Sequence, residues 1–146
     1  MRSNGDIYLL VGDLGYKVFD VHFRDYEKNC INCGAAEQSM LDIAIGLAYD
    51  GKIPVCYSIT SFLLYRAFEA IRTYVNYEKL NIKLIGSGRD YDYKHDGISH
   101  HSADDKAILS NMTNIKQFWP MEKREIPHLV TTMLKDNQPY YINLTR

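Results

Sequence analysis

Two kinds of reactive side chain lie close together near residue 30. Cys30 and Cys33 form a Cys-x-x-Cys pair, a spacing that suits a redox disulfide or half of a metal site. Glu37 follows four residues later and leads into a strongly apolar run. The short segment "NCINCGAAEQSM" therefore offers thiol, metal and carboxylate chemistry, and the elements around it decide among them.

The cysteine pair is a weak signal for thiol or metal chemistry. A structural zinc site needs four ligands, and the third of the three cysteines, Cys56, lies inside an apolar run. A reactive pair usually places its first cysteine at a helix N-terminus, where the thiolate is stabilised, whereas Cys30 lies in an expected strand. We favour the interpretation that the cysteines are buried packing residues. The alternative, a thiol redox protein, predicts loss of function in a double Cys→Ser variant.

Glu37 and three aromatic residues each allow two interpretations. A glutamate in the first turn of a helix interacts favourably with the helix dipole, but it can also be aimed at a ligand. Phe62, Tyr65 and Phe68 recur at three-residue steps along a helical segment. Aromatic residues at this spacing are more often core than a ligand platform, so the residue types alone leave both interpretations open.

The elements that position these side chains alternate along the chain as short apolar runs and amphipathic segments. The expected strands are 6–12, 29–33, 53–59, 82–86, 115–119 and 139–144. The expected helices are 16–26, 35–51, 61–79, 103–112 and 127–136. We expect helix 35–51 to be buried nearly all round and capped by Gly51, and helix 61–79 to be capped by Ser61.

This alternation predicts an α/β protein with a mainly parallel sheet in a three-layer α/β/α arrangement. Sites in such folds gather where strands end and helices begin. Three junctions qualify, and they are 12–15, 33–37 and 60–62. The loop 87–102, which has no periodicity, should end at the same rim. It carries His100 and His101, but no third ligand lies at a useful spacing, so we predict no metal site.

Composition narrows the classes of function. The 146 residues suit one domain, 1–146, and 46% apolar with 24% charged residues is ordinary for a globular protein. A formal net charge of −1 indicates no wholesale binding to nucleic acid or to an anionic membrane. The N-terminal segment "MRSNGDIYLLVGDLG" has too short an apolar run for a signal peptide. We expect a cytoplasmic protein without a membrane span.

Five ordered blocks carry a resemblance to a known family. They are "GDLG", "NCGAAEQSMLDIAIGLAYDGKIPV", "SFLLYRAFEAIR", "DGISHHSADDKAI" and "YYINLTR". Together they resemble the pyrimidine-binding domain of transketolases and deoxyxylulose-phosphate synthases, enzymes that use thiamine diphosphate. The blocks span nearly the whole chain, so the match is far more specific than any one motif. The resemblance implies the thiamine-diphosphate-binding fold and a ketol (two-carbon) transfer between sugar-type substrates.

The resemblance assigns the catalytic role to Glu37. Its carboxyl group would hydrogen-bond a ring nitrogen of the cofactor's aminopyrimidine and so promote removal of the thiazolium proton. The cofactor-binding residues implied by the match are Asp13, Leu14, Phe62, Tyr65 and Phe68. His100 matches a catalytic, substrate-contacting histidine, and Asp96 matches an aspartate that reads substrate hydroxyls.

Some positions depart from the family pattern. Transketolases carry an arginine before the proline of the fifth strand, where it helps to bind sugar phosphate, and here that position is Trp119. Arg89 or Lys94 could supply the missing positive charge. Whether the substrate is phosphorylated therefore stays open.

The family's second domain, marked by Gly-Asp-Gly and a later Asn, has no counterpart in this sequence. That domain holds the diphosphate and Mg²⁺, so the resemblance implies a diphosphate-binding partner subunit. We expect a hetero-oligomer and, by analogy with the family's two-site dimers, a heterotetramer in which pyrimidine domains also associate with one another. The alternative is a non-catalytic thiamine-diphosphate-binding or regulatory module that docks to a host enzyme.

Overall fold

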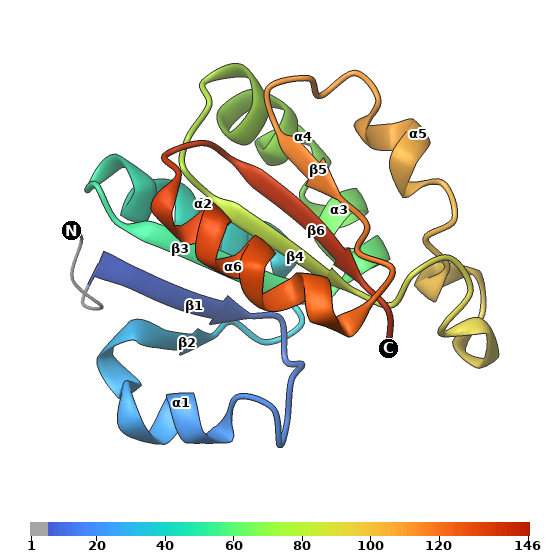
Figure 1. Ribbon diagram of the computed structural model, residues 1–146, viewed down its shortest axis with the longest axis horizontal. Coiled ribbons are helices and arrows are strands. Elements are labelled where there is room, and N and C mark those ends of the chain that lie inside the picture. Colours follow the sequence, from blue (N-terminus) through green and yellow to red (C-terminus); the bar gives the residue numbers. More distant parts are fainter. Residues whose placement is uncertain (1–5) are drawn as a thin grey trace.

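The computed structural model describes residues 6–146, and its centre is one six-stranded sheet in the order β2-β1-β3-β4-β6-β5 (Figure 1). Every pair of neighbouring strands runs parallel. The strands are β1 Ile7–Val11, β2 Cys30–Asn32, β3 Ile53–Ile59, β4 Lys83–Ser87, β5 Lys116–Phe118 and β6 Tyr140–Leu144. The first five residues of the N-terminal segment, for which no signal peptide is predicted, lie outside the described part.

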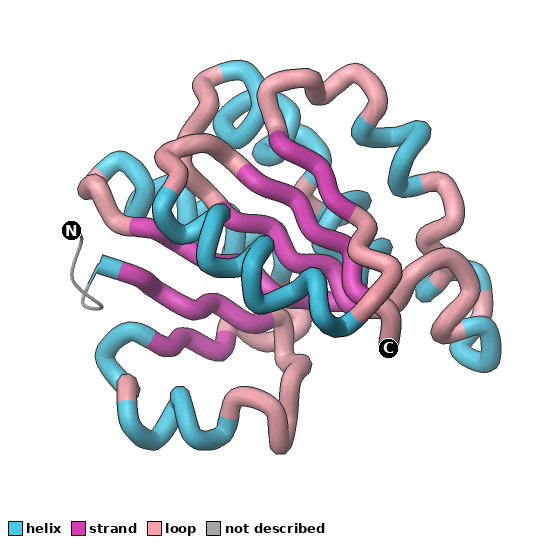
Figure 2. Tube along the Cα trace, in the orientation of Figure 1, coloured by secondary structure: helices cyan, strands magenta, loops and turns pink. Residues whose placement is uncertain are grey.

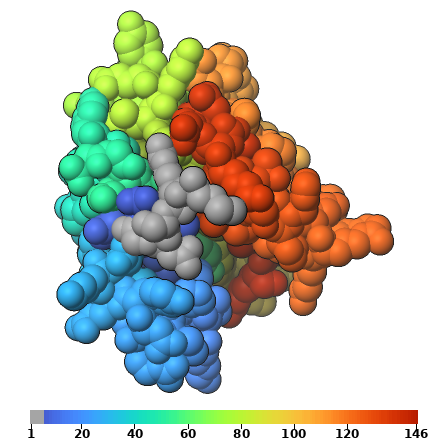
Figure 3. All heavy atoms as spheres, turned by 60° about the vertical axis from the view of Figure 1, so that its left-hand side comes forward, coloured from blue at the N-terminus to red at the C-terminus, as the bar shows by residue number. Residues whose placement is uncertain are grey.

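Helices cover both faces of the sheet, as Figure 2 shows, so the predicted three-layer α/β arrangement is confirmed. Helix α6 lies across one face, and α2, α3 and α4 lie behind the sheet (Figure 1). In the space-filling view, orange-red α6 forms a flank beside the blue surface of the N-terminal elements (Figure 3). The helices are α1 Asp20–Asp25, α2 Glu37–Tyr49, α3 Thr60–Arg66, α4 Phe68–Ala70, α5 Asp105–Leu109 and α6 Ile126–Lys135. Short 3₁₀ turns cover 27–29, 94–96, 98–100 and 123–125, and a π-helix, η3, spans Ile71–Tyr77.

The expected strands and most expected helices are present, and the central strands are the most buried. Strand β3 is an unbroken apolar run because it is covered on both sides, with Ile53 and Cys56 almost inaccessible. A large cluster of buried side chains fills the side of α2 and α3, and a smaller one around Met133 and Ile142 lies under α6.

Helix α2 differs from expectation on one side. Met40, Leu41 and Ala44 are fully buried against the sheet, but Ile43 and Tyr49 are exposed. The prediction that this helix is buried all round was wrong, because only one face meets the sheet and the other faces solvent. The predicted Gly51 turn is confirmed, since Gly51 has a φ of +75° and its N–H donates to the carbonyl of Ala48.

The expected helix 61–79 is interrupted. It begins at Thr60, breaks at Ala67 and continues through α4 into the π-helix. The predicted Ser61 cap was wrong, because the Ser61 hydroxyl donates instead to the carbonyl of Ser99 in the long loop. The Ser61 hydroxyl therefore holds the long loop against α3 and does not cap the helix.

Candidate active site

The first residue of α2, Glu37, lies at the carboxyl ends of the strands with only 1% of its surface exposed. The Ser58 hydroxyl donates to Oε1 over 2.7 Å, and Nη1 of Arg66 donates to Oε2 over 2.6 Å. A buried carboxylate must be hydrogen-bonded or paired, and these two donors do both. Neither Ser58 nor Arg66 was among the residues singled out in the sequence.

Gly12, directly after β1, leaves room for this carboxylate. A Cβ atom at position 12 would lie 2.6 Å from Ser58 Oγ and 3.0 Å from Glu37 Oε1. Both contacts are shorter than real Cβ atoms tolerate without movement of a neighbour. The close approach explains sterically why the first residue of "GDLG" is a glycine.

Arg66 joins the carboxylate to an aromatic ring. Its guanidinium carbon lies 3.8 Å from the centre of the Phe62 ring, one helical turn earlier on α3. Phe62 in turn meets the ring of His100 edge to face, with 4.8 Å between ring centres. Glu37, Arg66, Phe62 and His100 therefore form one continuous line of contacts from the buried start of α2 to the long loop.

The other two predicted cofactor aromatics point elsewhere. The Tyr65 hydroxyl donates to Asp104, and Tyr65 lines a hollow of about 510 Å³ on the loop side. Phe68, 40% exposed, lines a separate groove with Arg72. Steps of three residues drift by about 60° around an α-helix, so the three rings fan out along α3 and α4. Only Phe62 reaches the neighbourhood of Glu37, and it does so through Arg66.

Asp13 and Leu14 form the turn after β1. Asp13 has a φ of +53°, and its Oδ1 accepts hydrogen bonds from the Tyr16 hydroxyl and, over 3.2 Å, from Asn32 Nδ2. The Tyr16 hydrogen bond, helped by Asn32, holds the pKa of the Asp13 carboxyl below its usual value. Leu14 lines a small hollow beside Tyr16, so both residues lie at the rim.

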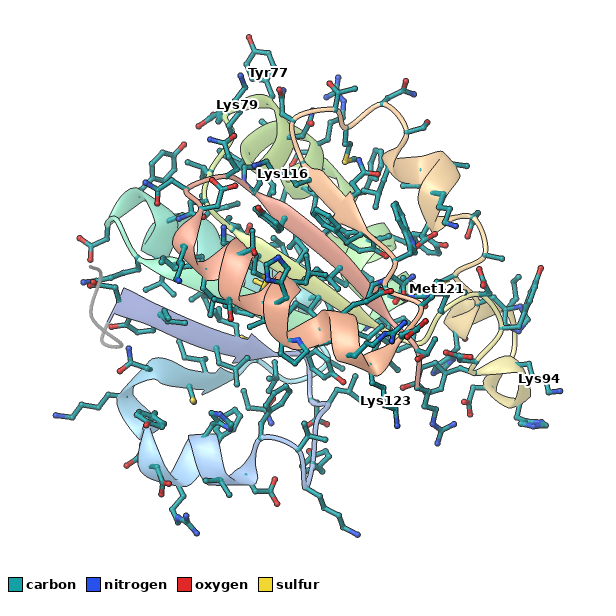
Figure 4. All side chains as sticks on the ribbon, in the orientation of Figure 1. Tyr77, Lys79, Lys94, Lys116, Met121 and Lys123 are labelled. Atoms are coloured by element: carbon teal, nitrogen blue, oxygen red, sulfur yellow. The ribbon has the colours of Figure 1, made fainter. Side chains whose placement is uncertain are left out.

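The loop after β4 places His100 and Asp96 differently. His100 packs between Phe62 and Tyr93, with ring centres 4.8 Å and 6.1 Å away. Asp96 ends a 3₁₀ turn and is exposed. Lys94, on the same turn, points away from the strand ends (Figure 4). Of the two predicted substrate residues, His100 alone is in contact with the line that starts at Glu37.

Comparison with known proteins gives this geometry a family. A model described as the transketolase pyrimidine-binding domain matches residues 2–146. The chain belongs to this family. The resemblance inferred from the five sequence blocks is thereby confirmed.

Relatives of the pyrimidine-binding domain include proteins described as parts of divided transketolases. The chain is 32% identical over 84% of its length to a putative transketolase C-terminal section of Methanocaldococcus jannaschii, covering 39% of that protein. It is also 32% identical to an apulose-4-phosphate transketolase subunit of Actinobacillus succinogenes, over 83% of the chain and 39% of the relative. The chain thus spans about two fifths of the length of these relatives.

Solved structures agree with the fold. A structure described as a split gene transketolase, inactive beta4 tetramer, superposes with a TM-score of 0.83 at 30% identity, over 98% of this chain and 46% of that one. Transketolase from Campylobacter jejuni gives a TM-score of 0.84 at 21% identity, over 97% of this chain and 23% of that one, and this likeness shows the fold alone. No helix within residues 6–146 is long and apolar enough to cross a membrane.

Two positively charged residues of this pyrimidine-binding domain were candidates for holding a substrate anion. Arg89 is only 9% exposed, and its Nη2 donates to the carbonyls of Pro120 and Asn143. Its guanidinium therefore supports the backbone of the rim, while Lys94 points outward (Figure 4). In this arrangement neither cation reaches the line from Glu37 to His100.

Trp119 belongs to a second buried carboxylate site, which the sequence did not reveal. Asp105, 2% exposed at the start of α5, accepts hydrogen bonds at Oδ2 from three side chains. The donors are Trp119 Nε1 at 2.7 Å, the Tyr141 hydroxyl at 2.8 Å and Asn143 Nδ2 at 2.5 Å. Trp119 is therefore part of the support beneath the rim.

The cysteines of the opening motif are free and partly buried, and Cys56 is fully buried. Burial raises the pKa of the Cys30 and Cys33 thiols, the opposite of what a reactive thiolate needs. Within residues 6–146 no group of three or more His, Cys, Asp or Glu side chains could hold a metal ion. Cys33 and Cys56 pack in or against the main core cluster.

Proposed function

We propose that this chain supplies the catalytic glutamate and the pyrimidine pocket of a thiamine-diphosphate-dependent, transketolase-like transferase. The observation that carries the proposal is Glu37, a buried carboxylate at a helix start on the rim where parallel strands end. The reaction is transfer of a two-carbon ketol unit between sugar-type substrates. The membership of the chain in the pyrimidine-binding family supports this assignment.

The residues present fit an aminopyrimidine ring. Such a ring has an apolar face and, once its ring nitrogen is protonated, an in-plane N–H donor, so it needs a buried carboxylate that shares this proton and an aromatic neighbour. Glu37 supplies the acceptor, Phe62 the neighbouring ring, and Gly12 the space beside the carboxylate. When bound, thiamine diphosphate supplies a nucleophilic carbon, which side chains lack.

The roles of the chain's own residues follow from their contacts. Glu37 would hold and move a proton at the ring nitrogen, and Ser58 fixes Oε1 so that the carboxylate keeps one orientation. Asp13, Leu14, Tyr65 and Phe68 remain predicted contacts of the cofactor. His100, in contact with Phe62, is the predicted catalytic residue that touches substrate, and Asp96 is the predicted reader of its hydroxyls.

A partner chain would complete the site. We assign the diphosphate and Mg²⁺ to a diphosphate-binding subunit, as the family resemblance implies. Relatives described as a transketolase subunit and as a transketolase C-terminal section support a divided enzyme, and a tetramer is described for one split transketolase. We infer a hetero-oligomer, with the heterotetramer as its expected form and with contacts between pyrimidine domains.

The test is reconstitution with the diphosphate-binding partner, thiamine diphosphate and Mg²⁺, followed by a ketol-transfer assay. Glu37→Gln should lower kcat by about 10²-fold or more, since a positioned proton-transfer group contributes at least that factor. Asp42→Asn on the exposed face of α2 is the matched control and should keep full activity. Undiminished activity of Glu37→Gln would overturn the proposed role.

A second candidate is a non-catalytic module that binds thiamine diphosphate or docks to a host enzyme. The observation in its favour is that neither Arg89, which holds backbone carbonyls, nor Lys94, which points outward, offers a cation to a sugar phosphate, while Trp119 supports the rim. Calorimetric titration of the complex with thiamine diphosphate, combined with product analysis, separates the two. Binding without turnover of any sugar or 2-oxo acid favours the module, and turnover favours the enzyme.

A further inference from the structure

Arg66 is the side chain at this site that the proposed function leaves unexplained. It pairs with Glu37 over 2.6 Å, although the Arg66 side chain is 43% exposed and the Glu37 side chain is 0% exposed. Its guanidinium also covers the Phe62 ring at 3.8 Å. Arg66, which reaches in from the solvent side, therefore contacts both Oε2 of Glu37 and the face of the Phe62 ring.

The guanidinium group has the shape and donors of the ring expected there. It is flat, carries N–H donors in its plane, and stacks on aromatic faces. An aminopyrimidine whose protonated ring nitrogen is bound by Glu37 would use the same two features, an in-plane N–H to a carboxylate oxygen and a neighbouring aromatic face. Since Ser58 already holds Oε1, Oε2 is the oxygen left for either donor, and in this structure Arg66 has it.

We propose that Arg66 is an internal stand-in for the cofactor's pyrimidine ring, and that it leaves Glu37 when the ring binds. The inference rests on the proposed function, because it names what the cofactor displaces. An exchange suits the burial of the two partners. Arg66 can return its head to water, whereas Glu37 would be a costly unpaired charge if nothing replaced the guanidinium.

The exchange makes Arg66 a determinant of cofactor affinity. Cofactor binding must break the Arg66–Glu37 ion pair. The free energy of that pair is therefore subtracted from the free energy of binding, which lowers the measured affinity. A half-exposed pair of this kind is worth roughly a 2- to 5-fold change in a binding constant. The same residue keeps the carboxylate satisfied, and therefore correctly placed, in the chain without cofactor.

The first experiment titrates thiamine diphosphate, with Mg²⁺, into the complex of this chain with its diphosphate-binding partner. Arg66→Met keeps an unbranched apolar side chain without the charge and should bind the cofactor roughly 2- to 5-fold more tightly than the wild type. Arg66→Lys keeps the charge without the flat group and should fall between the two. Equal or weaker binding by Arg66→Met overturns the inference, because it makes Arg66 irrelevant or a holder of the cofactor.

A second experiment needs neither the partner nor the cofactor. Arg66→Ala removes the guanidinium, and millimolar ethylguanidinium should raise its melting temperature while leaving the wild type unchanged. Ethylammonium, which is not flat, is the control ligand. The double variant Glu37→Gln/Arg66→Ala should lose the rescue, because the acceptor charge is gone. No rescue of Arg66→Ala overturns the claim that Glu37 and Phe62 form a platform for a flat cation.

The two proposals can fail separately. If the wild-type complex and both Arg66 variants all fail to bind thiamine diphosphate, the proposed function is overturned. If the wild type binds the cofactor but Arg66→Met shows no gain, the inference alone is overturned. A gain in Arg66→Met together with rescue of Arg66→Ala by ethylguanidinium supports both.

Discussion

Glu37 and Asp105 are two buried carboxylates that begin helices at the same end of the sheet, and they are held in opposite ways. Asp105 accepts from three side chains, Trp119, Tyr141 and Asn143, none of them charged. Glu37 has one neutral buried donor, Ser58, and one charged donor that reaches in from solvent, Arg66. The partners of Asp105 cannot leave without opening the core, whereas the charged partner of Glu37 can. The difference separates a carboxylate that supports the fold from one that can exchange ligands.

Removal of the Asp105 carboxylate is expected to have the largest effect on stability. Asp105→Ala leaves three donors without their acceptor, so the free energy of unfolding should fall by about 3 kcal/mol. Urea denaturation followed by circular dichroism measures it. Glu37→Gln is the comparison and should change the same quantity by less than about 1 kcal/mol, since Ser58 keeps an acceptor and Arg66 turns to water. Equal losses in the free energy of unfolding of the two variants would contradict the distinction between Asp105 and Glu37.

Crowding of the Glu37 site is expected to have an intermediate effect. Gly12→Ala places a methyl group 2.6 Å from Ser58 Oγ, so the free energy of unfolding should fall by about 1–2 kcal/mol and cofactor binding should weaken. Gly46→Ala, in open space on α2, is the matched control and should gain about 0.5–1 kcal/mol. Chemical denaturation and calorimetry measure both. A Gly12→Ala chain with wild-type affinity would show that the carboxylate needs no such space.

The smallest effect is expected for the cysteines next to Glu37. Cys30→Ser/Cys33→Ser should leave ketol transfer in the reconstituted complex unchanged, because burial raises the pKa of both thiols and leaves little thiolate near neutral pH. Thiol titration with a chromogenic disulfide at neutral pH should accordingly be slow in the wild type. Loss of activity in the double variant would revive the redox interpretation.

The strands, the parallel sheet and the position of Glu37 could be predicted because they follow from local patterns. Apolar runs such as Ile53–Ile59 identify buried strands, and the strand-to-helix turn before Glu37 places it at the rim. The break at Ala67 could not be predicted, because the apolar spacing of segment 61–79 is that of one continuous helix. Propensity is a weak guide when tertiary contacts, such as Ser61 with Ser99, determine where a helix begins.

The hydrogen-bond partners of Glu37 and Asp105 could not be predicted from the sequence for a different reason. Arg66 lies 29 residues from Glu37, and Tyr141 lies 36 residues from Asp105. Such pairs exist only once the sheet has brought distant segments together. The one local signal was Arg66 itself, a charge one helical turn after Phe62 in an otherwise apolar stretch.

The order of the strands has a consequence for how the chain folds. Strand β6 is inserted between β4 and β5, so it is synthesised last of the six but forms part of the interior of the sheet. Until residues 140–144 have left the ribosome, β5 has no neighbour and one edge of β4 stays open. Within residues 6–146 no hairpin is present to nucleate pairing, so every strand contact closes a long loop, which is typical of slow folders. The nascent chain should therefore remain a client for chaperones until its sixth strand emerges.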